Sequence, residues 1–235
     1  LKNWGKKNVP QKSQADNLDA FVFMVLVDAD HRDAAMLKYL ERDRPQLSVY
    51  ALSMYGLALH KLGEREKLAG VLQNIGQYVV EDEENQTAYL NMGEGNYWWY
   101  WYGSDNEAMA YYLKLLSQTD PKGRVASRLV KYMLNNRKNG TYWQSTRDTA
   151  LCVEALADYL KASGEAKPQL TVEVWLDGKK RKEVAIEGSN LFSFDNKFVL
   201  EGEALAAGRH TLELRKQGDG PLYYNAYQTN FTKEQ

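Results

Sequence analysis

The 235-residue sequence lacks several features that would define a class of protein at once. It has one cysteine, Cys152, so no disulfide can form within the chain, and it has only five prolines. Its longest apolar run, Ala20 to Val27, is too short to cross a bilayer. The 30 Lys and Arg residues nearly balance the 31 Asp and Glu residues, so the basic excess typical of nucleic-acid-binding proteins is missing. We therefore expect no nucleic-acid partner and no membrane contact by this chain.

Motifs for the common catalytic chemistries are absent as well. The three histidines, His31, His60 and His210, are scattered without zinc-ligand spacing, so we expect no bound metal. The sequence has no phosphate-binding loop, no dinucleotide fingerprint and no nucleophile elbow, which leaves no cofactor to predict. The aspartate clusters of terpene cyclases and the zinc-ligand set of prenyltransferases are missing too. The acidic run Glu81 to Glu84 could hold a cation loosely, but the favoured interpretation is part of a solvated loop.

The composition of the chain, with 44% hydrophobic and 26% charged residues, is that of a globular protein. From about Asp16 to Ala162 the apolar residues recur with helical spacing. In the first helix this spacing predicts an apolar face formed by Leu18, Phe21, Val22, Val25 and Leu26. Further helices are expected over residues 34–40, 47–62, 64–80, 104–119, 120–136 and 145–163. A polar loop is expected over residues 81–96, and Asp120 with Pro121 is expected to open the sixth helix.

Two of these helix starts share a pattern. Ser104 and Ser145 are predicted N-caps, and an acid, Glu107 or Asp148, follows each at the third helical position. The two serines lie 41 residues apart, the length of two helices with their turns, so the helical part is predicted to be a solenoid or a closed α/α toroid. The favoured role of the acids is structural, because an acid stabilises a helix start. The alternative is that they face each other as a catalytic carboxylate pair, as in glycoside hydrolases.

Beyond the charged linker Lys161 to Gln169, the apolar period changes to two. Asp177-Gly178 is a strong hairpin turn between two of the expected strands. We expect strands over residues 170–176, 182–186, 191–198, 210–216 and 222–231, which together form a small antiparallel β-sandwich. The predicted class is therefore α+β in two domains, a helical domain over residues 1–163 and a β domain over residues 164–235.

Six consecutive aromatic residues, Tyr97 to Tyr102, form the densest aromatic segment of the chain. They precede the helix start at Ser104. The equivalent segment before Ser145 has only two aromatics, Tyr142 and Trp143. A surplus of exposed aromatics is typical of a partner surface. We therefore predict an interdomain surface at Tyr97, Trp98, Trp99 and Trp101.

The stretch Asn139 to Leu156, with Trp143, Ser145-Thr146 and Asp148-Thr149, resembles the end of the thioester domain of the alpha-2-macroglobulin family. Residues 191–195 and 220–225 are similar to the segment that follows this domain in bacterial members. The resemblance implies an α/α toroid of about six helix pairs inserted into a CUB β-sandwich. Residues 1–163 would then be the later part of the toroid, and residues 164–235 the second part of the CUB domain.

Whole members of that family are endopeptidase inhibitors that trap a protease, and a thioester between Cys and Gln in C-x-E-Q acylates the captive. Here the only cysteine lies in Cys152-Val153-Glu154-Ala155, where alanine offers no acyl carbon, and it falls on the last predicted helix instead of an early one. The resemblance therefore implies a non-enzymatic fragment without a thioester, and Cys152 is predicted to be a core residue.

The partners that the resemblance implies are proteases, through the intact parent protein, and neighbouring domains of the same polypeptide. The implied location is periplasmic or extracellular, with membrane anchoring of the parent left open. The start at Leu1, without Met or a signal segment, is interpreted as the end of a fragment or of a processed chain. The alternatives are an α/α-toroid enzyme, such as a carbohydrate-active enzyme or cyclase with an accessory β-domain, and a plain interaction module.

Overall fold

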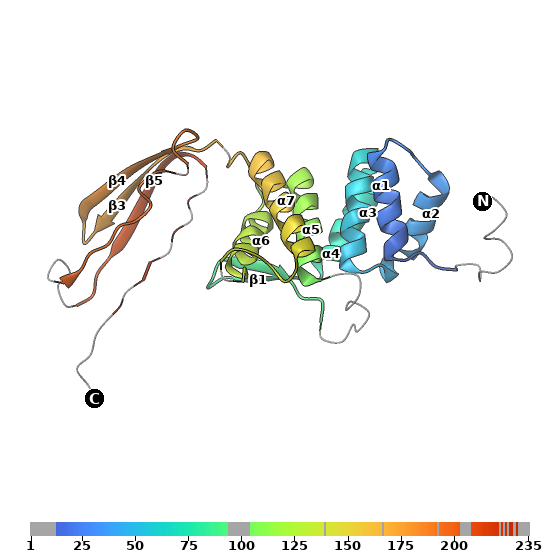
Figure 1. Ribbon diagram of the computed structural model, residues 1–235, viewed down its shortest axis with the longest axis horizontal. Helices are drawn as coiled ribbons and strands as arrows, with labels where there is room; N and C mark the ends of the chain where they lie inside the picture. The colour runs from blue at the N-terminus through green and yellow to red at the C-terminus, as the bar shows by residue number, and fades with distance from the viewer. Residues whose placement is uncertain are drawn as a thin grey trace, which may run out of the picture. The chain divides into compact units, whose positions relative to one another are not determined.

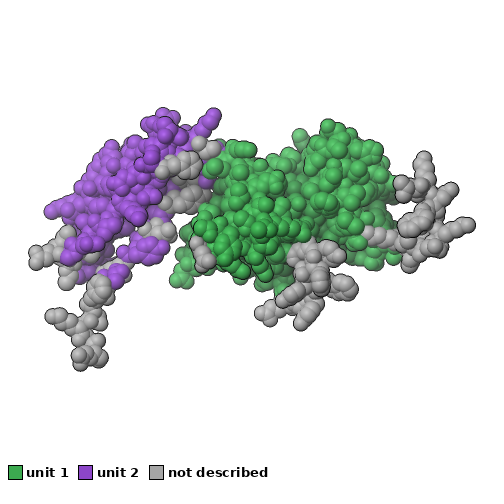
Figure 2. Space-filling view, viewed as in Figure 1, with its two compact units in different colours: residues 1–163 green, residues 164–235 purple. Residues whose placement is uncertain are grey.

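The computed structural model describes residues 13–93, 104–138, 140–165, 167–191, 193–202 and 208–220, and the single positions 222, 224, 226, 227 and 229. The chain divides into two compact units, unit 1 (Leu1–Ser163) and unit 2 (Gly164–Gln235), shown in green and purple in Figure 2. The regular structure in the described part of unit 1 is helical apart from one small hairpin, and unit 2 contains a separate sheet (Figure 1). The chain is therefore an α+β protein, and each unit is described by itself below.

Seven α-helices form most of the described part of unit 1 (Figure 1). They are α1 (Asn17–Asp28), α2 (Ala34–Asp43), α3 (Val49–Leu62), α4 (Arg65–Gly76), α5 (Asp105–Thr119), α6 (Arg124–Asn135) and α7 (Thr146–Ser163). A short 3-10 turn, η1 (Arg44–Gln46), follows α2 and carries Pro45. Gly63 ends α3 in the left-handed conformation at φ 73°, which a glycine adopts without a steric penalty. These helices confirm the prediction that residues 16–162 are largely helical.

Four of the helices form a row in the order α1, α3, α5, α7, in which each packs on the next. A second helix packs on each of the first three members, α2 on α1, α4 on α3 and α6 on α5. The inner members of the row are buried on nearly all sides: α3 has 11 buried residues among its 14, and α5 has 10 among its 15. The members at the two ends, α1 and α7, have four buried residues each. The core of unit 1 therefore centres on α3 and α5.

The first helix buries a different face from the one that the sequence predicts. Its buried residues are Ala20, Phe23, Met24 and Val27. The predicted apolar face lies on the opposite side, and Leu18, Phe21, Val22 and Val25 on that side are exposed. The prediction was wrong because residues 20–27 are apolar all round the helix, so periodicity alone cannot select the buried side.

A β-hairpin replaces the predicted acidic loop. Strand β1 (Val79–Asp82) pairs antiparallel with β2 (Thr87–Leu90), so residues 79 and 80 do not belong to α4 as predicted. β2 packs on α6, and the Tyr89 ring stacks on Tyr132 at 5.0 Å between ring centroids. Arg128 of α6 is 6% exposed and donates hydrogen bonds to Glu81, Glu83 and Gln86 at 2.8 to 2.9 Å. The acidic run is thus a structural part of the hairpin and not a free solvated loop.

The sixth helix also begins later than predicted. Asp120 ends α5 as its C-cap, Pro121 lies in the turn that follows, and α6 begins at Arg124 after the N-cap residue Gly123. The Gly123 backbone is extended, with φ −68° and ψ 151°, so the helix cannot continue backwards through it. The predicted cap at Asp120 was therefore wrong by about one helical turn.

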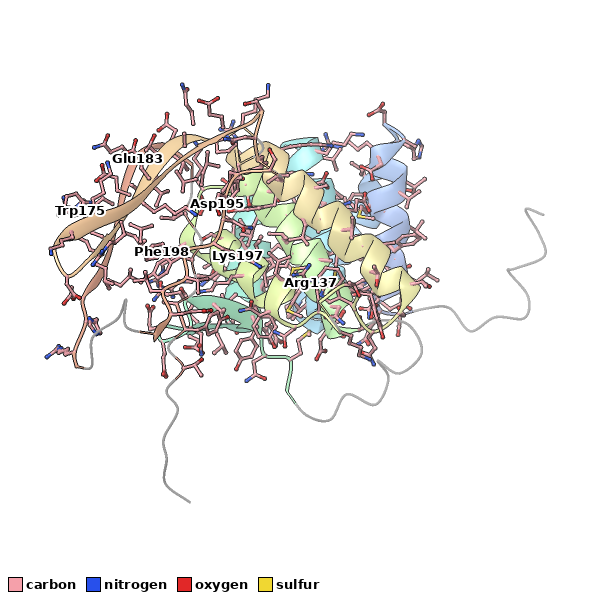
Figure 3. The ribbon with its side chains drawn as sticks, turned by 60° about the vertical axis from the view of Figure 1, so that its left-hand side comes forward. Arg137, Trp175, Glu183, Asp195, Lys197 and Phe198 are labelled. Atoms are coloured by element: carbon pink, nitrogen blue, oxygen red, sulfur yellow. The ribbon has the colours of Figure 1, made fainter. Side chains whose placement is uncertain are left out.

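Unit 2 contains a three-stranded antiparallel sheet in the order β4-β3-β5. Strands β3 (Gln169–Leu176) and β4 (Lys179–Glu187) are joined by the turn at Asp177-Gly178, both of whose residues have positive φ, and β5 (Leu212–Asp219) flanks β3 on the other side. Trp175 of β3 and Glu183 of β4 mark two strands of this sheet in Figure 3. In the described part of unit 2 the buried core is small, with Leu170, Val172 and Ile186 as its members.

Two predicted strands of unit 2 are not strands in the described residues. The described residues between 191 and 198 form turns and irregular chain, in which Leu191 and Phe194 pack against the small core. Lys182 of β4 holds this segment by a 2.6 Å ion pair with Asp195 and a hydrogen bond to the Lys197 carbonyl. Asp195 and Lys197 are labelled in Figure 3. At the described positions between 222 and 229 there is no strand either. The described part of unit 2 has one sheet, so the sandwich stays a prediction.

Candidate functional site

The starts of the four row helices lie at one end of unit 1. Ser48, the N-cap of α3, donates to the Asn17 side chain at the start of α1 at 3.0 Å. Ser104, the N-cap of α5, donates to Asp148 in the first turn of α7 at 2.8 Å. Arg147 of α7 donates to the Tyr50 hydroxyl of α3 at 3.3 Å. The four row helices are therefore parallel, and we call the end that holds their starts the N-terminal pole.

Both predicted caps are present at this pole. The Ser104 hydroxyl accepts the Glu107 backbone N–H at 3.1 Å, and the Ser145 hydroxyl accepts the Asp148 backbone N–H at 3.0 Å. The two acids reach towards neighbouring helices: Asp148 accepts from Ser104 of α5, and Glu107 pairs with Arg147 of α7. The structure thus brings all four predicted cap residues together in one cluster across α5 and α7.

The Glu107 carboxyl has unusual surroundings. It is 2% exposed, its Oε1 lies 2.6 Å from Arg147 Nε, and its Oε2 has no hydrogen-bond partner of ordinary geometry among the described residues. Burial raises its pKa above the ordinary value, and the nearby Asp148 raises it further; Arg147 and the Ser104 backbone N–H lower it. Arg147 is 57% exposed, so water screens much of its charge.

Sequence reasoning did not single out Arg147 or Tyr50 as members of this cluster. Arg147 sits between Ser145 and Asp148 in the repeat, where it looks like an ordinary exposed helix residue. Tyr50 lies in the first turn of α3, and its ring packs edge-on against Tyr111 of α5 at 5.2 Å between centroids. No local sequence pattern connects Tyr50 with Arg147, because they are 97 residues apart and only the fold brings them together.

The Cys152 thiol lies one turn further along α7. It is fully buried, and burial raises its pKa to about 12, with smaller contributions from Asp148 and Glu107. The buried face of α7 consists of Asp148, Cys152, Ala155 and Tyr159. Helical spacing predicts that Thr149, Cys152, Val153 and Leu156 share a buried face. This prediction was wrong for Val153, which is 55% exposed. Cys152 itself is a core residue, as predicted.

A groove with a volume of about 540 Å³ crosses the row near the opposite end of unit 1. It is lined by Met24, Asp28, Leu57, His60, Lys61, Tyr111, Lys114, Gln118, Glu154 and Asp158. Its charges are largely paired within the wall, since Lys114 lies 2.6 Å from Glu154 and 3.5 Å from Asp158. Neither Glu107 nor Asp148 lines it, so the two buried acids do not open into this groove.

The predicted aromatic surface, Tyr97, Trp98, Trp99 and Trp101, lies outside the described residues. Among the residues that the structure describes, no group of three or more His, Cys, Asp or Glu side chains is placed to hold a metal ion. Over the same residues, no helix combines the length and apolar character that crossing a bilayer requires.

Comparison with known proteins supports a relationship to alpha-2-macroglobulin-like proteins. The chain is 30% identical over 142 residues to the alpha-2-macroglobulin homolog of a Nostoc species. The match covers 60% of this chain but only 7% of that protein, so the chain spans a small part of the length of its relative. No protein-family model matches the chain.

Proposed function

We propose that this chain is a fragment of an alpha-2-macroglobulin-like endopeptidase inhibitor and that it acts without catalytic chemistry of its own. The observation that carries the proposal is the 30% identity over 142 residues to an alpha-2-macroglobulin homolog. In this proposal, unit 1 is the later part of an α/α toroid, and unit 2 is the second part of a CUB-like β-sandwich. From the same relationship, the proposed location of the protein is periplasmic or extracellular.

The arrangement of the row helices supports the toroid part of this proposal. Alternation of a row helix with an outer helix is the building pattern of α/α toroids. In a closed ring, each row helix packs on a neighbour at both flanks, whereas α1 exposes Leu18, Phe21, Val22 and Val25 at one flank. Further helices of the same polypeptide would cover this stripe. The buried area of one helix is small for association between separate chains, but it suffices within one chain.

The intact polypeptide provides the test of this function. Mixed with an endopeptidase, it should block cleavage of a large protein substrate while cleavage of a short peptide substrate continues, because a trapped protease remains accessible to small molecules. Deletion of residues 1–235 should abolish the block. Equal inhibition of large and small substrates, or no inhibition, would overturn the proposal.

The absence of a thioester in this chain has its own test. Ala155 is fully buried three positions after Cys152 and cannot form an acyl bond with the thiol. The 235-residue chain should therefore incorporate no labelled methylamine. Stoichiometric labelling would show that the chain holds a reactive acyl group.

An enzymatic function is the second candidate, because the structure places Glu107 and Asp148 in one cluster on neighbouring helices. A carboxylate pair that acts on a glycoside must reach the substrate. The two residues are 2% and 3% exposed, so this candidate needs an opening of the pole. Hydrolysis of a panel of oligosaccharides that is lost in Glu107→Gln and in Asp148→Asn would favour it over the inhibitor function.

A further inference from the structure

The N-terminal pole contains two buried carboxyl groups and one partly exposed cation. Glu107 and Asp148 are 2% and 3% exposed, and Arg147 bonds to Glu107 Oε1 at 2.6 Å. We call these three residues the clasp, because they connect the first turns of α5 and α7, and Arg147 extends the connection to Tyr50 of α3. Two buried negative charges with a single solvent-screened cation form an unbalanced arrangement.

The negative charge that lacks a compensating partner lies at one oxygen atom, Glu107 Oε2. Asp148 Oδ1 accepts a hydrogen bond from Ser104, whereas Glu107 Oε2 is buried and has no partner of ordinary geometry among the described residues. An unpartnered carboxylate oxygen away from water is costly, and a proton on that oxygen removes the charge. The helix start and Arg147 favour the ionised form, while burial and Asp148 favour the protonated form.

The other titratable groups around Glu107 do not supply a compensating charge. Tyr50 of α3 and Tyr111 of α5 have hydroxyl pKa values raised by burial, and the Cys152 thiol of α7 has its pKa raised to about 12. All three are therefore neutral in ordinary conditions. Asp148 and Arg147 are the charged groups that face Glu107 in the described structure.

We propose that the clasp is a proton-operated contact between α3, α5 and α7, with Glu107 as the group that takes up the proton. With Glu107 ionised, Arg147 is held against its carboxylate and against the Tyr50 hydroxyl. A proton from solvent on Oε2 neutralises the carboxyl, the ion pair is lost, and the Arg147 guanidinium turns into water. The pole then gains one positive charge and loses a cross-link of the row. This inference rests on the geometry of unit 1 and does not depend on the inhibitor function.

NMR titration of the 235-residue chain with carbon-13 in the glutamate carboxyl groups tests the clasp. The Glu107 signal should titrate above the ordinary range of a solvated glutamate, and the Arg147 Nε–H signal should shift with the same midpoint. In Asp148→Asn, both midpoints should move to lower pH, because a like charge has been removed. In Glu107→Gln, the Arg147 signal should have the released position at every pH.

Glu154→Gln is the matched control. It removes one negative charge from the same helix, but Glu154 is 58% exposed and pairs with Lys114 away from the pole, so both midpoints should stay as in the original chain. The proposal is wrong if Glu107 titrates in the ordinary range, or if the Arg147 signal does not follow its titration. If Glu107→Gln does not fold, the original chain and Asp148→Asn still decide between these outcomes.

Discussion

At the scale of single residues, burial controls the chemistry of the one thiol. Cys152 is fully buried among side chains of the core, so a thiol reagent should react with it only after denaturation. Cys152→Ala removes one small buried group and should lower the free energy of unfolding by about 1 kcal/mol. Thiol titration with and without denaturant, and urea unfolding of the variant, measure both effects. Rapid labelling of the native chain would contradict the buried position.

Arg128 allows a prediction about acid stability. Its hydrogen bonds lower the Glu83 pKa from 4.5 to about 2. Because the folded pKa lies below the unfolded one, the stabilisation is present above about pH 4.5 and is lost as the pH falls towards 2. Arg128→Met should lower the thermal midpoint at neutral pH and weaken its dependence on pH in this window.

Arg124→Met is the control for that experiment. Arg124 lies on the same helix and pairs with Glu81 and Glu83, but its side chain is 62% exposed, whereas the Arg128 side chain is 7% exposed. Exposed ion pairs contribute only about 0–1 kcal/mol, so this variant should unfold nearly as the original chain does. Equal losses in the two variants would show that the burial of Arg128 is not what stabilises the hairpin.

At the scale of elements, α1 provides the most direct test of which face is buried. Phe23 is fully buried and Phe21 is 41% exposed, although the two rings are only two positions apart. Phe23→Ala should cost about 3–5 kcal/mol of unfolding free energy, as is typical for a buried phenylalanine. Phe21→Ala should change it by at most about 0.5 kcal/mol, as at other surface positions. Chemical denaturation of the two variants distinguishes the faces, and a large loss in Phe21→Ala would show that this stripe is covered.

Prediction from sequence worked where the signal was local. Ser104 and Ser145 precede apolar periodic segments, and each caps its helix as predicted by accepting the backbone N–H of the acid three positions later. The hairpin at residues 79–90 could not be predicted in this way, because its strands are four residues long and its acids are paired by Arg128, 45 residues beyond Glu83. Two of the three clasp residues, Glu107 and Asp148, were singled out by the repeat, whereas Arg147 joins them only through packing, as does the Tyr50 hydroxyl that Arg147 contacts.

At the scale of the whole molecule, the two units differ greatly in the size of their cores. Among the residues that the structure describes, the buried core of unit 2 has three members, whereas that of unit 1 extends over all seven helices. A small core supplies little hydrophobic stabilisation, so unit 2 should unfold at lower urea concentration than unit 1. Trp143 reports on unit 1 and Trp175 on unit 2, and fluorine-19 NMR of fluorotryptophan resolves them. A single shared transition would show that the units unfold as one.

The one-sided packing of the end helices has a consequence for how unit 1 opens. In arrays where each member contacts only its neighbours, an end member detaches without disturbing the centre. Amide hydrogens of α3 and α5, which are buried on nearly all sides, should exchange with deuterium only in rare, global openings. Those of α1 and α7 should exchange through smaller openings in which the end helices detach. The row would thus fray from both ends towards a slow-exchanging centre.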